Sequence, residues 1–309
     1  MEPRVKMLVA LYCIGSSAML VINKGAVTLM PQPLVLLALQ LFATCLLAIG
    51  LHLSGSAVIK LVPRRDVARG YFAVAVVFLA TLYSNMMILE EAGVEMFIVL
   101  RSCTPFAVCI LDFAFLGREL PNLRSAFSLV ATFCCCSGYI MLKETLGNSW
   151  NSDSIFWCCV WYAIFVFDQI FIKLIVDRFP ANGWERTLYQ NAFALGLAAT
   201  WMAMRPPELT IPNSIESGTV FAASMVFASC ICGAVLSYAV MSLRGEVSAT
   251  MFTMLGIGCK MFSILLNEIF INTERHFTQL GLVALAILTS ASYEQAPKRG
   301  SSKSLAPGA

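Results

Sequence analysis

The sequence consists largely of apolar runs about 20 residues long, separated by short polar loops. A helix of about 20 mostly apolar residues can cross a bilayer, because its backbone satisfies its own hydrogen bonds. Candidate spans lie near 7–29, 34–53, 70–89, 94–116, 123–142, 154–176, 184–204, 218–241, 247–271 and 278–293. Only 13% of the residues are charged, against about a quarter in soluble domains. The sequence therefore predicts an all-α membrane protein with about ten transmembrane helices.

The loop charges predict how these helices are oriented. When loops are assigned alternately to the two sides, one side holds most of the basic residues, among them Arg4, Arg64, Arg118, Arg186 and Lys303. The other side holds mainly acidic residues. Because basic loops stay in the cytosol, we expect both chain termini there.

The two halves of the chain, 1–145 and 146–296, resemble each other weakly. Gln40 and Gln190 lie at almost the same offset in their halves. Two halves with an odd number of spans insert in opposite orientations, and inverted repeats are typical of alternating-access transporters. We therefore expect two inverted five-helix repeats, followed by a disordered cytosolic tail at 297–309 that is rich in Gly, Ser and Pro.

Two cations lie deep within predicted spans. Arg101 and Lys260 have no acidic residue three or four positions away on their own helices. A charge in the bilayer centre costs at least about 2.5 kcal/mol, so each cation needs a partner or an aqueous cavity. An anionic substrate would satisfy both cations. The alternative is a structural salt bridge with Asp112, Asp168 or Glu268.

Two glycines and a third lysine are further candidates for contact with a substrate. Gly256 and Gly258 precede Lys260 by about one turn and would let a bulky ligand approach. Packing between helices also explains such glycines. Lys24 lies near the end of its span, where it could contact substrate or extend to the interface.

The polar group Tyr189, Gln190 and Asn191 opens the seventh predicted span. Amides can read a nucleobase edge by paired hydrogen bonds, and tyrosine can stack or donate from its hydroxyl. Interfacial anchoring by Tyr189 and interhelical bonding by the amides explain the same residues without a ligand.

Several classes of ligand are not expected. The 12 cysteines lie mostly in apolar runs and there are only two histidines, so we expect neither a metal site nor a disulfide framework. No cofactor is expected. The net charge of +3 is small and spread over loops, which disfavours a nucleic-acid partner. The scattered carboxylates disfavour a membrane-bound glycosyltransferase, so we expect no enzyme activity.

Specific motifs then suggest a family. They are Tyr12-Cys13 with Asn23-Lys24, Arg101, Leu188-Tyr189-Gln190-Asn191, Ser237-Tyr238, and Gly256-Ile257-Gly258-Cys259-Lys260. In these motifs the chain resembles the nucleotide-sugar transporter family of the drug/metabolite transporter superfamily, and most closely its GDP-mannose branch. The resemblance implies that Tyr189, Gln190, Asn191 and Ser237 contact the nucleotide. It also implies that Tyr12, Lys24, Arg101, Gly256, Gly258 and Lys260 surround the sugar and phosphates.

The chain departs from that branch at three positions. Gln190 and Cys259 stand where the branch has asparagine, and Phe252 stands where it often has tyrosine. Lys260, the basic residue that ends the last motif, is the same as in the branch, whereas the two asparagine positions are changed. The motifs therefore favour a phosphate-bearing substrate over GDP-mannose in particular.

From these features we expect a Golgi antiporter in the lipid bilayer that exchanges a cytosolic nucleotide sugar for a lumenal nucleoside monophosphate. Transport of a phosphorylated sugar, or of a neutral metabolite, by the same fold is the alternative. The oligomeric state is open, and a homodimer is compatible with the sequence.

Overall fold

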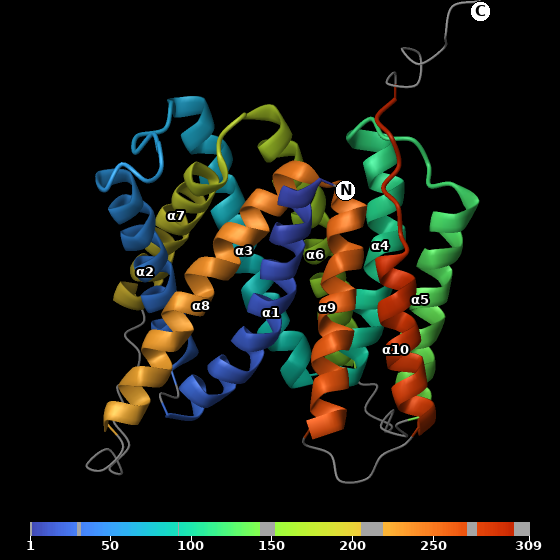
Figure 1. Ribbon diagram of the computed structural model, residues 1–309. Coiled ribbons are helices and arrows are strands. Elements are labelled where there is room, and N and C mark those ends of the chain that lie inside the picture. The colour runs from blue at the N-terminus through green and yellow to red at the C-terminus, as the bar shows by residue number, and fades with distance from the viewer. Residues whose placement is uncertain are drawn as a thin grey trace, which may run out of the picture. The chain divides into compact units, whose positions relative to one another are not determined.

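The computed structural model describes residues 2–29, 32–91, 93–142, 152–204, 219–270 and 277–299, and these form ten helices (Figure 1). The helices are α1 (Pro3–Leu29), α2 (Pro33–Leu53), α3 (Arg65–Glu91), α4 (Gly93–Phe115), α5 (Leu123–Leu142), α6 (Ser152–Arg178), α7 (Gly183–Met204), α8 (Thr219–Glu246), α9 (Ala249–Phe270) and α10 (Phe277–Ala291). Each predicted span coincides with one helix, so the all-α prediction is confirmed. Six helices contain stretches long and apolar enough to cross a membrane.

The helices extend beyond the predicted spans where their ends are polar. Helix α3 begins at Arg65 rather than near residue 70, and α8 continues to Glu246 rather than ending near 241. Hydropathy detects only the apolar part of a helix. Charged residues at its end stay helical because they reach the interfacial region, where water and headgroups solvate them.

The chain forms two compact units. Unit 1 comprises Met1–Leu79 and Ile175–Glu246, and unit 2 comprises Ala80–Leu174 and Val247–Ala309. Each unit therefore combines helices from both halves of the sequence: α1, α2, α7 and α8 belong to unit 1, whereas α4, α5, α9 and α10 belong to unit 2. Helices α3 and α6 contribute to both units. The inverted repeat of 1–145 and 146–296 stays a prediction.

In unit 1, α8 packs against both α1 and α2, and α2 also packs against α7 (Figure 1). Two glycines permit close approach: the Cα of Gly15 faces Leu236, and that of Gly233 faces Met19 and Gln40. Small residues at helix contacts are expected in a membrane, where close packing rather than hydrophobic burial drives association.

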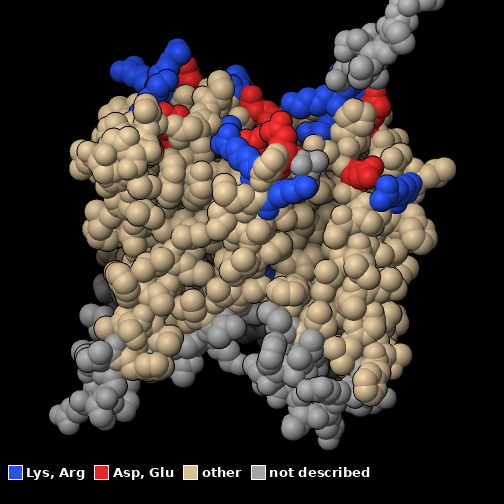
Figure 2. Space-filling model, viewed as in Figure 1, with Lys and Arg blue, Asp and Glu red and all other residues tan. Residues whose placement is uncertain are grey.

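Charged residues gather at one end of unit 1. Arg4 of α1 lies 4.0 Å from Glu246 of α8. At the start of α7, Asn182 and Glu185 each accept a hydrogen bond from the backbone N–H of the other, which is a capping box. Glu185 also accepts a bond from the backbone N–H of Lys60 at 3.0 Å. In Figure 2, blue and red side chains occupy helix ends and uncharged residues cover the helix flanks.

In unit 2, α10 packs against α5 and α9, and α4 packs against the same two helices. A core forms where they meet, and it includes Cys136, Ile140, Met261 and Ala286, all fully or almost fully buried. Helices α4 and α9, which carry the two deep cations, are therefore direct neighbours.

The segment after α10 is fixed to the loop between α4 and α5. Arg118 donates to the backbone oxygen of Ala296 at 2.7 Å, and the N–H of Glu119 donates to that of Pro297 at 3.0 Å. The N–H of Arg299 donates to the oxygen of Gly117 at 2.8 Å. Residues 297–299, the first part of the predicted tail, are therefore packed in place, and residues 300–309 lie outside the described residues.

Substituting Gly183 tests the contact between α7 and α8. A Cβ at this position would lie 2.0 Å from Ser242 Oγ and 3.0 Å from the Tyr238 ring. Gly183→Ala should therefore destabilise the protein by about 1–3 kcal/mol, seen as a lower Tm in detergent. Gly196→Ala on the same helix is the control, since nothing lies within 4 Å of that position. Adding Ser242→Ala should restore part of the loss, and no restoration would contradict this account.

Candidate functional site

The predicted site residues belong to two groups, one in each unit. Arg101, Gly256, Gly258 and Lys260 lie in unit 2. Tyr12, Lys24, Tyr189, Gln190, Asn191 and Ser237 lie in unit 1. Each group is described here within its own unit.

The two deep cations of unit 2 lie on helices that pack against each other, Arg101 on α4 and Lys260 on α9. Both residues are partly buried. Lys260 forms no salt bridge with any residue that the structure describes. The carboxylate of Asp112, one of the alternative partners, bonds instead to Thr250. Two cations on neighbouring helices of one unit make a candidate binding site for an anion.

Aromatic rings surround the guanidinium of Arg101. Its Cζ lies 5.8 Å from the ring centroid of Phe97 and 5.1 Å from that of Phe165. Phe165 stacks on Trp161 at 4.9 Å between centroids. Cation–π contacts hold a guanidinium without neutralising it. Pro105, four residues after Arg101, has no N–H to bond the Arg101 carbonyl, so α4 lacks one backbone hydrogen bond at this level although the helix is continuous.

The two glycines of α9 are in different surroundings. Gly256 is buried. Gly258 faces α10, since a Cβ there would lie 2.6 Å from Ser290 Oγ. Gly258 therefore permits the close contact of α9 with α10, which is the packing role that the sequence also allowed. Its place beside a sugar stays a prediction.

The two amides of α7 are buried in unit 1. Asn191 Nδ2 donates to the backbone oxygen of Thr187 at 2.7 Å and to Ser237 Oγ on α8 at 2.8 Å. These bonds use both donors of the amide. Gln190 is only 6% exposed, and its Oε1 receives no hydrogen bond from any described residue. An unsatisfied buried acceptor is costly in a protein interior, and such atoms often have a ligand as partner.

The other predicted residues of unit 1 are Tyr189, Tyr12 and Lys24, and each has different surroundings. Tyr189 donates to the backbone oxygen of Lys60 at 2.5 Å and packs edge-on against Tyr71, so it anchors the loop between α2 and α3. Tyr12 is buried. The side chain of Lys24 lies outside the described residues, although its backbone belongs to α1.

A closed polar cluster joins three helices of unit 1. Gln40 Nε2 on α2 donates to Asn23 Oδ1 on α1 at 3.1 Å and to Ser229 Oγ on α8 at 2.7 Å. Ser229 Oγ in turn donates to Asn23 Oδ1 at 2.6 Å. The three side chains therefore satisfy one another inside an apolar region.

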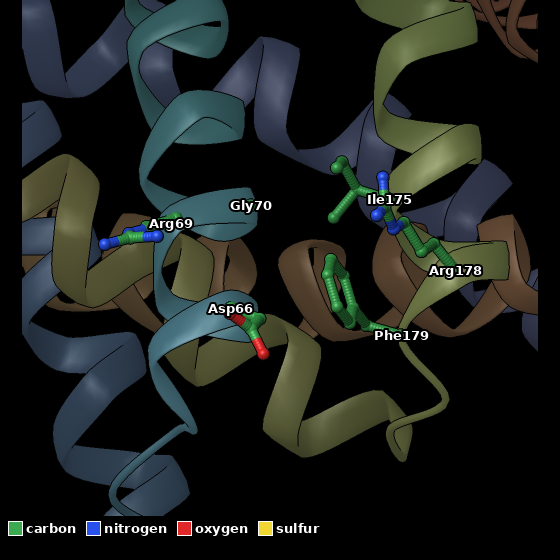
Figure 3. Close-up of a pocket in the computed structure, with 6 residues that line it drawn as sticks. All are labelled: Asp66, Arg69, Gly70, Ile175, Arg178 and Phe179. Atoms are coloured by element: carbon green, nitrogen blue, oxygen red, sulfur yellow. The ribbon is translucent and has the colours of Figure 1, made fainter.

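A cleft of about 410 Å³ opens at the charged end of unit 1, between the start of α3 and the end of α6 (Figure 3). Asp66, Arg69, Gly70, Ile175, Arg178 and Phe179 line it. Its charged residues are exposed and of both signs, and Arg69 points away from Phe179 (Figure 3). No predicted site residue lines this cleft.

The cysteines and the acidic residues offer no metal centre in the described part of the chain. No group of three or more His, Cys, Asp or Glu side chains there could hold an ion. All 12 cysteines are free thiols.

Comparison with known proteins identifies the family. No protein-family model matches the sequence. The chain is 32% identical to GDP-fucose transporter 1 of Arabidopsis thaliana over 295 residues, which cover 93% of this chain and 84% of that protein. The chain belongs to the nucleotide-sugar transporter family.

A second named relative agrees with this family, and a solved structure shares the fold. The transporter is 28% identical to the GDP-mannose transporter GONST3 of Arabidopsis thaliana, over 89% of this chain and 73% of that protein. A protein of known crystal structure, 12% identical, shares the fold with a TM-score of 0.70 over 94% of this chain and 96% of its own. The named relatives are transporters rather than enzymes, as the sequence predicted.

Sequence reasoning missed the rings around Arg101 of this nucleotide-sugar transporter. Phe97 could have been found, because it lies four residues before Arg101 and hence on the same helix face. Phe165 and Trp161 come from α6, and no local pattern connects them with α4. The bond from Asn191 to Ser237 likewise joins two motif residues that are far apart in the sequence.

Proposed function

We propose that this protein is an antiporter that exchanges a cytosolic GDP-sugar for lumenal GMP across the Golgi membrane, with both termini in the cytosol. The observation that supports it most is the packing of α4 against α9, the helices that carry the cations Arg101 and Lys260. The relatives named for GDP-fucose and GDP-mannose transport give the substrate class.

The two cations bind the diphosphate. A guanidinium offers a planar fork of donors, and an ammonium is a compact charge, so together they suit the two linked phosphates of a nucleotide sugar. Phe97 and Phe165 hold the guanidinium of Arg101 in place through cation–π contacts.

The amides of α7 select the base. Because Asn191 uses both its donors within the protein, its Oδ1 is the group left for a ligand, and Gln190 also offers an oxygen. Two acceptors suit a base edge that presents donors. Guanine presents its N1–H and its N2 amino group side by side, whereas uracil presents one N–H. This chemistry favours guanosine, in agreement with the names of the relatives.

The other residues are assigned within their own units. In unit 2 we assign Gly256 and Gly258, which lie within about one turn of Lys260, to the sugar; in unit 1 we assign Tyr12 to the sugar and Lys24 to the phosphates. Tyr189 positions the start of α7 by its bond to Lys60, next to the amides that read the base.

Exchange follows from the electrostatics of the site. When the site is empty, the ammonium of Lys260 has no ion-pair partner among the described residues, so the conformational change that carries the empty site across is unfavourable. Either nucleotide supplies this partner. We infer alternating access by two inverted five-helix repeats, 1–145 and 146–296.

Uptake by proteoliposomes tests the proposal. Vesicles preloaded with GMP should take up GDP-mannose or GDP-fucose at least about tenfold faster than empty vesicles, because the return step is slow without a nucleotide. Unlabelled GMP should compete far better than UMP, CMP or a sugar phosphate. Equal uptake by loaded and empty vesicles would refute obligate exchange. Equal competition by GMP and UMP would refute guanosine selection, and preferential competition by a sugar phosphate would indicate the alternative substrate.

A further inference from the structure

The start of α9 is held by side chains from two other parts of unit 2. Thr250 N–H donates to Asp112 Oδ2 of α4 at 2.8 Å. Ser248 N–H donates to Gln295 Oε1, in the segment after α10, at 3.0 Å, and Met251 N–H donates to Ser248 Oγ at 3.0 Å. The first N–H groups of a helix have no partner within it. Here tertiary contacts satisfy two of them, which ties the helix end to its neighbours.

Asp112 makes the stronger of the two tertiary contacts. It is only 3% exposed, and its Oδ2 also accepts from Thr250 Oγ1 at 2.5 Å. A carboxylate at a helix N-terminus interacts favourably with the helix dipole, and its hydrogen bonds are charge-assisted. Because burial of a carboxylate is costly, this contact constrains how far α9 can slide along α4.

The contact lies at a matching distance from both cations. Arg101 precedes Asp112 by 11 residues on α4, and Lys260 follows Thr250 by 10 residues on α9. At a rise of 1.5 Å per residue, these separations are about 16 Å and about 15 Å along the two helices. Since α4 runs toward the contact and α9 runs away from it, the contact sets both cations at nearly one depth.

We propose that Asp112 and Gln295 are positioning residues that fix the axial register of α9 and so hold Lys260 opposite Arg101. This inference rests on the proposed function, in which the two cations bind the diphosphate. It assigns a transport role to residues remote from the phosphates, one of them outside the helices. A one-residue slip of α9 would displace the ammonium by about 1.5 Å, enough to spoil shared binding of one diphosphate.

Thr250→Val and Asp112→Asn test the inference with little change in shape. Each should raise the KM for the GDP-sugar about tenfold, with maximal rate nearly unchanged, because the cations are displaced but not removed. Thr250→Ser keeps the hydroxyl and should retain the parental KM. Gln295→Ala should raise KM less, since it removes a neutral bond.

Asn122→Ala is the matched control. Asn122 caps α5 by accepting from Ser125 N–H at 2.9 Å, in the same unit but on a helix without a predicted site residue. The Asn122→Ala substitution should lower Tm by about as much as Thr250→Val and Asp112→Asn do, and it should leave the KM for the GDP-sugar unchanged. If Thr250→Val and Asp112→Asn lower Tm but keep the parental KM, as Asn122→Ala does, the positioning role is wrong. Normal transport by Lys260→Ala would instead refute the proposed function, so the two failures are distinguishable.

Discussion

Replacing Lys260 with alanine is expected to lower GDP-sugar uptake about a hundredfold or more. Removing one partner of a desolvated, hydrogen-bonded charge pair costs about 2–5 kcal/mol, and each 1.4 kcal/mol is a factor of ten. The loss should appear equally in GMP binding, because both exchange substrates carry phosphate. Uptake into GMP-loaded proteoliposomes and the shift of Tm by GMP measure the two effects.

Stability separates this effect from misfolding. Lys260 forms no salt bridge with any described residue. Its removal should therefore leave the Tm of the empty protein unchanged or slightly higher. Lys260→Arg should retain partial uptake. Arg124→Ala is the control, since Arg124 and its partner Glu294 are both exposed, and it should transport normally. Wild-type uptake by Lys260→Ala would exclude the ammonium from the site.

Gln190→Met is expected to change stability and binding in opposite directions. The substitution removes a buried oxygen that has no hydrogen-bond donor among the described residues, and such an atom costs about 1–3 kcal/mol. Methionine has a similar length and fills the same space. The empty protein should therefore gain a few degrees in Tm.

Binding should weaken in the same variant. If the amide oxygen accepts a bond from guanine, its loss should reduce the preference for GMP over UMP about tenfold, because the base is left with an unsatisfied donor. Competition assays measure the ratio. A purely structural role predicts that stability falls while the GMP to UMP ratio stays constant. Asn191→Ala is not an equivalent test, since Asn191 also connects α7 to α8.

The sequence predicted the helices well, and for a plain physical reason. A span such as Pro33–Leu53 has no charged residue, so its hydropathy alone fixes its existence. Helix ends were less accurate because polar residues continue α3 and α8 into the interface. The capping box formed by Asn182 and Glu185 at the start of α7 was not predicted, although their spacing is typical of one.

The candidate site was only partly predictable. Arg101 and Lys260 were identified because apolar surroundings make any charge conspicuous. That they lie on neighbouring helices, and that Asp112 bonds to Thr250 rather than to a cation, depends on the packing of α4 against α9. The contacts of residues 297–299, which the sequence assigned to a tail, were not predicted, because these residues bond to a loop more than 170 positions earlier.

The cluster of Asn23, Gln40 and Ser229 has a consequence for how this family can diverge. Each side chain is the hydrogen-bond partner of the other two, so a single apolar replacement leaves two largely buried polar groups short of a partner, whereas replacing all three together leaves none. Among relatives, these positions should therefore keep all three polar residues or exchange all of them, and mixed sets should be rare. Evolutionary change at these three positions would therefore pass through sequences with one or two replacements, and those proteins should fold poorly.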